Sequence, residues 1–335
     1  MELLYFYALA HQTSFDVRWL KKGTVGETLM RPLVDQLVSE HGLEVRGGCF
    51  VEGLELTEGR VSSLRCRTFG SSEASKVEDL DGVVLALGAG GMRAVMRGTP
   101  EVASSCPNLA AAGSLGGVDV ISVRLWLDRT VSTEWSANVL SRFQGLRGAG
   151  GTFFMLDQLQ PDQRALWGGE EPQGSVVACD FYNAGALLPL SDKDLVALLS
   201  EQLLPSAVPA FRGAKVVDSF VGRFPAGVTW FSPGSFRSRP TLESPVDNLV
   251  CAGDWVRLGS REHGAKGLCQ ERAFVTGLEA ANSLARRGLL GADHRREHNV
   301  IAIREDEVQV RLGKAGAKSL AGLLQPFGLA SPWVR

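Results

Sequence analysis

The chain has 335 residues, of which 44% are hydrophobic, enough to bury one large core or two smaller ones. Its 35 basic and 37 acidic side chains leave a formal net charge of -2, which excludes a general attraction of the whole chain to nucleic acid or to an anionic membrane. Thirty-nine glycines without a fixed period exclude collagen and simple repeats and favour a turn-rich α/β protein.

Hydrophobic periodicity predicts a helix over residues 24–42, because Leu29, Leu33 and Leu37 recur at helical spacing. We expect its regular part to begin at Pro32 and Gly42 to end it. Strand-like alternation follows, interrupted by polar stretches. In this part of the chain we predict strands at 43–45, 50–56 and 61–67, a turn at 58–60, a polar loop at 70–79, a buried parallel strand at 81–88 and a loop at 98–118.

The middle and the last third alternate apolar segments with connections rich in glycine and proline. Ser191 is a natural N-cap for a helix over 192–204, and a second helix over 270–287 is expected to end before Gly288. The predicted strands are 118–127, 153–156, 216–221 and 248–254, and the predicted connections are 145–151, 168–174 and 225–247. The last forty residues give little signal. Two buried strands that end in glycine flank a middle of alternating strands, which predicts an α/β nucleotide-binding unit with an antiparallel insert.

Six cysteines lie far apart in the sequence, at positions 49, 66, 106, 179, 251 and 269. Most fall in apolar runs, and no CxxC pair occurs. This pattern favours reduced, buried thiols over a disulfide framework. No apolar run reaches the ~18 residues of a membrane-spanning helix.

The most specific pattern occupies residues 233–281. It consists of Pro233-Gly234, Arg239-Pro240, Asn248-Leu249, Ala252-Gly253-Asp254-Trp255, Gln270-Glu271-Arg272-Ala273, Thr276-Gly277 and Ala280-Ala281. In this order the residues resemble the C-terminal FAD signature of the FAD-dependent amine oxidase and phytoene or carotenoid desaturase superfamily. That signature combines a PG…RP loop, a strand ending in AGD or AGE, and a helix of the EGA…SG…AA type.

The resemblance implies FAD as the cofactor and assigns roles to individual positions. Gly253 allows the backbone to approach the ligand, Asp254 bonds ribityl or ribose hydroxyls, and the following helix directs its positive N-terminal end at the O2 and N1 edge of the flavin. The implied cofactor residues are Val51, Gly253, Asp254, Gln270, Glu271, Arg272, Ala273 and Gly277. Among them, Val51 occupies the position at which the backbone of a valine contacts the adenine in the family. We expect Gly277, with Ala273 and Ala280, to let the helix pack tightly on the sheet.

Two positions depart from the family pattern. Arg272 stands where the family usually has glycine, so the helix start carries a cation close to the flavin or is shifted. The loop between Asp254 and Glu271 is longer than in the family and holds additional glycines.

A second glycine-rich turn, Gly88 to Gly91, begins where the predicted strand 81–88 ends, within the sequence VVLALGAG of residues 83–90. This strand resembles the family strand beside FAD, yet its turn lacks two parts of a dinucleotide fingerprint. Arg93 occupies the sixth position, and no acidic residue ends a second strand ~20 residues later. No convincing GxGxxG occurs elsewhere, and the chain begins with the apolar MELLYFYALAHQTSFD, which resembles neither a signal peptide nor a transit peptide. We therefore interpret the sequence as N-terminally truncated.

The resemblance implies an α/β fold with a Rossmann-like FAD-binding domain of the glutathione-reductase type. We expect this domain at 18–104 and 226–290, without its first βαβ unit. An inserted substrate domain with an antiparallel α+β sheet is expected at 105–225, and a C-terminal extension at 291–335. Within the insert, Val123 to Asp128 resembles a strand of the desaturase branch. The insert and the segment after it carry aromatic residues that could line an apolar tunnel or fill the core, namely Phe153, Phe154, Trp167, Phe181, Tyr182, Phe224, Trp230 and Phe231.

The resemblance implies an FAD-dependent oxidoreductase, either desaturase-like or amine-oxidase-like, that transfers a hydride from a small apolar substrate to the flavin. The desaturase branch suggests an isoprenoid or carotenoid-like substrate, and the electron acceptor stays unidentified. No general base stands out, and flavin chemistry needs none. Two alternatives remain open: a non-catalytic fragment or incomplete gene model that acts at most as a binding module, and a flavin enzyme with redox-neutral chemistry.

Other site types find little support in the sequence. His294 and His298 are four residues apart but have no third ligand, so a solvated face is favoured over a metal site. The sequence contains no GxSxG or HExxH motif and no basic stretch interleaved with aromatic residues for nucleic acid. Peripheral membrane contact stays open, and the compartment is undetermined between the cytoplasm and, for a photosynthetic source, the plastid.

Overall fold

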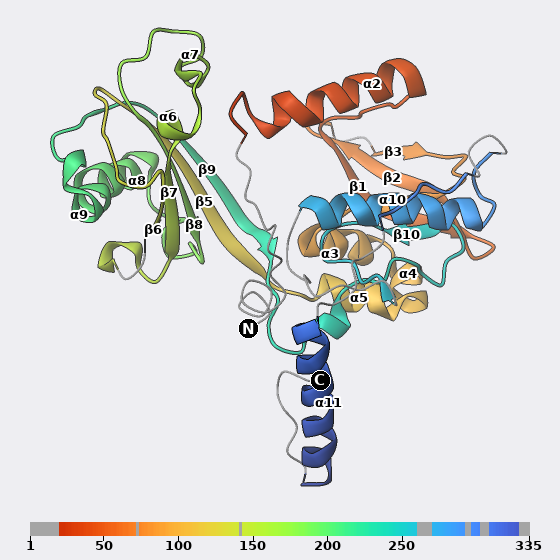
Figure 1. The fold of residues 1–335 in the computed structure, drawn as a ribbon. Coiled ribbons are helices and arrows are strands. Elements are labelled where there is room, and N and C mark those ends of the chain that lie inside the picture. Colours follow the sequence, from red (N-terminus) through yellow and green to blue (C-terminus); the bar gives the residue numbers. More distant parts are fainter. Residues whose placement is uncertain are drawn as a thin grey trace. The chain divides into compact units, whose positions relative to one another are not determined.

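The computed structural model describes residues 20–71, 74–140, 143–259, 270–291, 296–301 and 308–327 (Figure 1). The chain forms two compact units. The described part of the first unit comprises 47–116 together with segments from 229 to 327, and that of the second comprises 20–46 and 117–228. The mixed α/β fold with an antiparallel insert, predicted from the sequence, is confirmed.

The first unit contains an antiparallel sheet in the order β1-β2-β3. Its strands are β1 (Cys49–Thr57), β2 (Arg60–Thr68) and β3 (Ala74–Val77). Glu58 and Gly59 form the predicted turn, and both have positive φ angles, 53° and 77°, as a tight hairpin requires. The predicted loop at 70–79 is wrong where β3 lies. That strand has no apolar alternation and is defined by its pairing with β2, which the sequence does not show.

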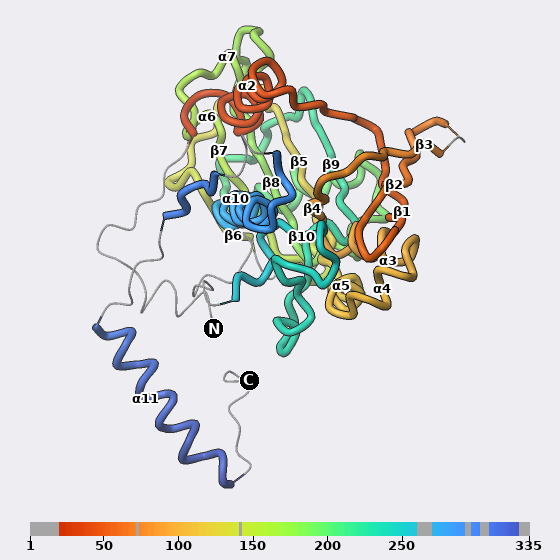
Figure 2. Tube along the Cα trace, turned by 90° about the vertical axis from the view of Figure 1, so that its right-hand side faces the viewer, coloured from red at the N-terminus to blue at the C-terminus, as the bar shows by residue number. Residues whose placement is uncertain are grey.

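The first unit also contains a parallel strand pair, formed by β4 (Val83–Leu85) and β10 (Leu249–Cys251). Both were predicted as buried strands, the first of them as parallel, and the helix predicted after the second is α10 (Gln270–Arg286). In both views α10 runs beside β10, and the helices that follow β4 cluster together (Figures 1 and 2). These are α3 (Ala89–Gly98), α4 (Pro100–Ser105) and α5 (Pro107–Gly113).

The predicted loop over 98–118 is wrong, because α4, α5 and the first residues of β5 lie there. Each helix has a proline in its first turn, where proline is tolerated, but neither is long enough to show a helical period. Their apolar side chains join the core of the unit, as Val102, Leu109 and Ala112 are fully buried. This core also contains residues of β2, β4, α3, β10 and α10.

The second unit is built on a five-stranded sheet in the order β6-β7-β8-β5-β9. Its strands are β5 (Gly117–Leu127), β6 (Ala137–Leu140), β7 (Gly150–Met155), β8 (Val176–Tyr182) and β9 (Val216–Thr229). The strand predicted at 216–221 is correct but continues through Pro225 to Thr229. Proline is accommodated because β9 is an edge strand.

Helices cover the sheet of the second unit and complete its core. The predicted Ser191 cap is confirmed, since its hydroxyl accepts from the Asp194 N–H at 3.1 Å. The helix continues as α8 (Asp192–Ala197), the π-helical η3 (Leu198–Leu203) and α9 (Leu204–Ala207), so Pro205 lies inside it and not beyond it as predicted. Phe153 and Phe181 are each 1% exposed, which places these two aromatics in the core and not along a tunnel.

The predicted N-terminal helix is confirmed as η1 (Gly26–Met30) followed by α2 (Arg31–His41), with Gly42 in the left-handed conformation at its end. The strand predicted at 43–45 does not form. A 17-residue helix, α11 (Val308–Leu324), lies within the last forty residues, where no element was predicted. The remaining short helices are η2 (Gln144–Leu146), α6 (Leu156–Leu159), α7 (Gln163–Leu166), η4 (Pro209–Phe211), η5 (Ser235–Ser238) and η8 (Gln325–Phe327).

The described cysteines agree with the expectation of reduced thiols. Cys66, Cys106, Cys179 and Cys251 are buried, Cys49 is partly buried, and these five are thiols outside any disulfide. Burial raises the pKa of the Cys251 thiol to about 12, with a smaller contribution from nearby Cys106, so it stays protonated at neutral pH. Cys269 and His294 lie outside the described residues.

Candidate functional site

A cavity of about 420 Å³ opens in the first unit at the ends of β4 and β10. Because the two strands are parallel neighbours, their carboxyl ends meet at the same edge of the sheet, where ligands bind in open α/β folds. The first turn of α10 completes the wall. The lining residues are Ala86, Leu87, Gly88, Gly253, Asp254, Trp255, Gln270 and Ala273.

Gly253 forms the turn after β10 and has a φ angle of +136°, a conformation that side chains other than glycine rarely adopt. A single buried hydroxyl fixes this turn to α10. The Gly253 N–H donates to Thr276 Oγ1 at 2.9 Å, and Thr276 Oγ1 lies 3.0 Å from the Gly253 carbonyl oxygen. The position of the turn relative to α10 therefore depends on Thr276.

We expect Thr276→Val to loosen this turn. The substitution keeps the shape of the side chain but leaves the Gly253 N–H without its acceptor, which costs about 1–3 kcal/mol. Chemical unfolding of the variant measures the loss, and Thr276→Ser, which retains a hydroxyl, is the control. Equal stability of the valine and serine variants would contradict the role given to this hydrogen bond.

Trp255 connects the two strand ends across the cavity. Its indole N–H donates to the Leu87 carbonyl oxygen at 2.8 Å, and the side chain is 2% exposed. The bond joins a residue that follows β10 to one that follows β4, so it holds the two walls at a fixed spacing.

Asp254 contributes the carboxylate of the cavity wall and is half-buried. Burial raises the pKa of this carboxyl above its ordinary value, and the guanidinium groups of Arg239 and Arg272 oppose part of the rise. Arg239 is itself 4% exposed, and its guanidinium stacks 3.7 Å from the centre of the Phe231 ring. The Asp254 carboxyl faces a cavity and is partly desolvated. It can therefore accept hydrogen bonds from the hydroxyl groups of a bound ligand in place of those from water.

The raised pKa predicts how stability depends on pH. Because folded Asp254 binds its proton more tightly than the unfolded chain does, wild-type stability falls as pH rises from the ordinary Asp value to the raised pKa, and then levels off. Asp254→Asn lacks this titration, so the difference in unfolding free energy, variant minus wild type, should grow with pH across that window. Unfolding curves at several pH values measure this difference.

The same comparison with Glu134→Gln, at an exposed position, is the control. A pH-independent difference for Asp254→Asn would contradict the raised pKa assigned to Asp254.

Two helix N-termini reach the cavity. Gly88 lines it and is the N-cap of α3, and Gln270 lines it as the first residue of α10. Helix N-termini present free N–H groups and a positive dipole end, which together favour negatively charged ligand groups. A Cβ atom built on Gly88 would meet nothing within 4 Å, so this turn leaves room for a ligand.

The structure brings four of the eight predicted site residues together. Gly253, Asp254, Gln270 and Ala273 line one cavity, whereas the other four do not. Glu271 is exposed on α10. Val51 lies in β1 and packs, partly buried, against the core of the first unit.

The surroundings of Arg272 and Gly277 differ from what the sequence suggested. Arg272 is 1% exposed and donates to the Val256 carbonyl oxygen at 2.5 Å, so its cation is buried in the protein and is not part of the cavity lining. Gly277 is exposed, and a Cβ there would meet nothing within 4 Å. The predicted tight packing at Gly277 is wrong because it lies off the buried face of α10, which Thr276 and Ala280 form.

Sequence reasoning missed Trp255 and the segment from Ala86 to Gly88 as lining residues. The signal for the segment was present, since the buried strand ending in Gly88 was identified and set aside as an imperfect fingerprint. The contribution of Trp255 depends on a bond to a residue far away in the sequence, which no local pattern reveals.

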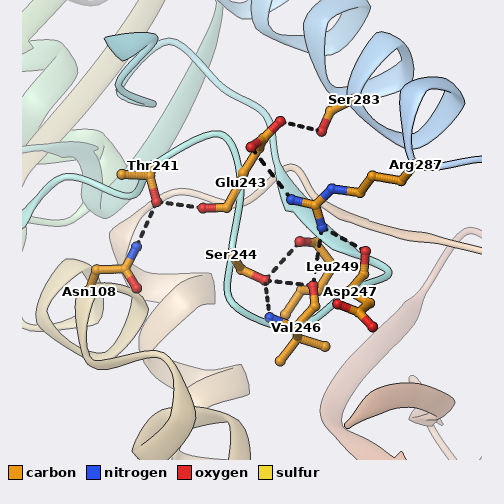
Figure 3. A network of polar contacts seen from close by, with 9 residues as sticks. All are labelled: Asn108, Thr241, Glu243, Ser244, Val246, Asp247, Leu249, Ser283 and Arg287. Atoms are coloured by element: carbon orange, nitrogen blue, oxygen red, sulfur yellow. Dashed lines mark hydrogen bonds and ion pairs between the residues drawn. The ribbon is translucent and has the colours of Figure 1, made fainter.

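A polar network holds the segment that leads into β10 (Figure 3). Glu243 accepts from the Ser283 hydroxyl at 2.8 Å and pairs with Arg287 at 3.6 Å, which ties the segment to α10 and the turn after it. On the other side, the Asn108 amide donates to Thr241 Oγ1 at 2.8 Å. Ser244 closes the loop by donating to the Leu249 carbonyl oxygen at 2.8 Å. This network sets where β10 begins and, through it, where Gly253 and Asp254 lie.

The model of one protein family, flavin-containing amine oxidoreductases, matches residues 4–288. The chain belongs to this family. Membership confirms the flavin cofactor, FAD, that the sequence predicted. The residues at the cavity fit such a group, since the open turn at Gly88, the turn at Gly253, a carboxylate and two helix N-termini surround one space.

Two curated proteins are similar to part of the chain. The carotenoid phi-ring synthase of Streptomyces griseus is 29% identical over 209 residues, which cover 62% of this chain and 37% of that protein. The chloroplastic/chromoplastic 15-cis-phytoene desaturase of Solanum lycopersicum is 26% identical over 240 residues, which cover 70% of this chain and 38% of that protein. The chain thus spans less than half the length of these relatives.

Among solved structures, cyclohexylamine oxidase from Brevibacterium oxydans IH-35A is 13% identical with a TM-score of 0.40, covering 68% of this chain and 48% of that one. This likeness is too low to carry an argument. Across the described residues, no helix combines the length and the apolar character that a membrane crossing requires. No three His, Cys, Asp or Glu side chains within the described ranges gather as a metal site.

Proposed function

We propose that the chain contributes the flavin-binding and substrate-binding parts of an oxidoreductase that removes a hydride from an apolar substrate. The observation that carries the proposal is the meeting of two parallel strand ends, two helix N-termini and the Asp254 carboxylate at one cavity. When bound there, FAD supplies the hydride acceptor. The protein's own residues bind and orient the cofactor and exclude water.

Individual residues have distinct roles in this proposal. The Asp254 carboxylate accepts hydrogen bonds from ribityl or ribose hydroxyls, and the backbone turn at Gly253 lets the ligand approach closely. The N-terminal turn of α10, from Gln270 to Ala273, directs its N–H groups and positive dipole end to the flavin edge that gains charge on reduction. Val51 contacts the adenine, and Gly277 stays a proposed cofactor neighbour.

We assign the FAD-binding domain to 18–104 and 226–290, the substrate domain to 105–225 and the C-terminal extension to 291–335. The names of the relatives, a carotenoid ring synthase and phytoene desaturases, support an isoprenoid or carotenoid-like substrate. The electron acceptor is unidentified. A substrate of this kind partitions into lipid, so peripheral contact with a membrane accompanies the proposal.

A titration of the purified chain with FAD tests the proposal. We expect flavin absorbance bands near roughly 370 and 450 nm to survive desalting of the wild-type protein. Asp254→Ala should bind FAD about 10- to 100-fold more weakly, because hydrogen bonds to a charged group contribute about 1.5–3 kcal/mol. Glu134→Gln, which removes an exposed carboxylate outside the cavity, should bind as the wild type does.

Three outcomes would contradict the proposal. A folded, monodisperse wild-type sample that retains no flavin would favour the alternative of a non-catalytic binding module. Retained flavin with unchanged affinity in Asp254→Ala would place the cofactor elsewhere. Turnover without any net electron acceptor would point instead to redox-neutral flavin chemistry.

A further inference from the structure

Helix α11 and the short η8 that continues it carry an exposed apolar face. Within this segment Val310 is the only residue classed as buried. The exposed large apolar side chains, with their exposed fractions, are Val308 (60%), Leu312 (68%), Leu320 (57%), Leu323 (68%) and Phe327 (76%). Exposure of so many large apolar side chains to water is unfavourable, so we expect this face to bind a partner or a membrane surface.

The same helix carries a basic face. Arg311, Lys314 and Lys318 follow one another at helical spacing, all three are exposed, and residues 308–327 contain no Asp or Glu. At 3.6 residues per turn, the exposed large apolar residues of α11 span an arc of about 120°, and the three cations lie on the opposite side, where the buried Val310 also lies. The helix is therefore amphipathic, and its charged residues are all basic.

We propose that α11 and η8 dock in the plane of an anionic lipid surface. The apolar side chains insert below the headgroups, and the three cations snorkel to the lipid phosphates. Each Lys or Arg near such a surface contributes about 1 kcal/mol. The formal net charge of -2 does not oppose this, because charges more than about 8–10 Å away are largely screened at physiological salt.

The sequence around the helix favours one end for insertion. Glu305, Asp306 and Glu307 come directly before α11 in the sequence, so the attraction to anionic lipid is weakest at its N-terminal end. Leu320, Leu323 and Phe327 lie towards the C-terminal end and are exposed. We therefore expect the C-terminal half to insert more deeply. The basic face is complementary to an anionic surface but contributes nothing to pairing of two copies through their apolar faces, so lipid is favoured over a second copy as the occupant.

This inference rests on the proposed function for the membrane contact, which it assigns to a particular helix, but it does not depend on flavin binding. Co-sedimentation of the full chain with phosphatidylcholine vesicles, prepared with and without phosphatidylserine, tests it. We expect binding to the phosphatidylserine vesicles that weakens as salt is added. The triple variant Arg311→Glu, Lys314→Glu, Lys318→Glu should bind them on the order of 100-fold more weakly.

A matched control reverses three charges elsewhere. Lys21, Lys22 and Lys193 are exposed and lie outside α11, and their replacement by glutamate changes the net charge by the same amount. This control should keep most of the vesicle binding. Equal losses in the two triple variants, or no preference of the wild type for phosphatidylserine, would overturn the proposal.

The apolar contribution is tested separately with Leu312→Gln, Leu320→Gln and Leu323→Gln combined. Glutamine has a helix propensity close to that of leucine, so circular dichroism should show an unchanged helix content, while vesicle binding falls more than about tenfold. Size-exclusion chromatography of the wild type and this variant distinguishes a second copy of the chain. A wild-type dimer that becomes a monomer in the variant, with vesicle binding unchanged, would overturn lipid docking.

Every variant should bind FAD as tightly as the wild type does. The FAD titration therefore distinguishes failure of lipid docking from failure of the proposed function.

Discussion

Replacement of Asn248 by alanine is expected to lower the free energy of unfolding by about 2–5 kcal/mol, as two buried backbone groups then lose their partners. The Asn248 side chain is fully buried. Its amide donates to the Val61 carbonyl oxygen at 2.8 Å, and its Oδ1 accepts from the Val61 N–H at 2.8 Å. The side chain thereby bonds β2 to the residue before β10, 187 positions away in the sequence.

Chemical unfolding of the alanine variant measures this effect. Asn138→Ala is the matched control, because that amide makes one local hydrogen bond, to the Trp135 carbonyl oxygen at 2.7 Å, on the protein surface. The control should lose less than about 1 kcal/mol. An equal loss in both variants would show that the paired contact of Asn248 with Val61 adds little.

The second large effect is expected at Gly253. An alanine there has to accommodate a φ angle of +136°, and its Cβ would lie 3.1 Å from Cδ1 and 3.3 Å from Nε1 of the Trp255 indole. Backbone strain of this kind costs about 1–3 kcal/mol. Relief of the strain would move the turn away from Thr276 and deform the cavity wall, so FAD affinity should fall together with stability.

Gly313→Ala serves as the control for Gly253→Ala. Gly313 lies inside α11, and a Cβ there would meet nothing within 4 Å. Alanine should stabilise that helix by up to about 1 kcal/mol and leave the FAD titration unchanged. A Gly253→Ala protein with wild-type stability and affinity would show that the turn does not require its present conformation.

The elements that form the cavity were predictable because their signals are local. The strands β4 and β10 are continuous apolar runs that end next to glycine, and α10 has a clear helical period. Four of the predicted site residues line the cavity for the same reason, since they lie at the ends of these elements.

The elements that were missed depend on contacts far along the chain. Strand β3 exists through its pairing with β2, and the short α4 and α5 are stabilised by burial of a few side chains in the core of the unit. The functions of Asn248, Thr276 and Trp255 likewise arise from hydrogen bonds to distant residues. For α11, glycines at 313, 316 and 322 obscured a helix whose polar and apolar faces become evident once it is formed.

The hydrogen bond between Trp255 and Leu87 spans 168 positions of the sequence, so it cannot form until late in the synthesis of the chain. The contacts that close the cavity are among the least local in the chain, and closing such long loops is slow because their entropy is lost before the contacts form. During synthesis, β4 has no neighbour β10 until the whole intervening unit has left the ribosome. We therefore expect the ability to capture flavin to emerge late, after the second unit has acquired its own structure, so that cofactor uptake marks the completion of folding.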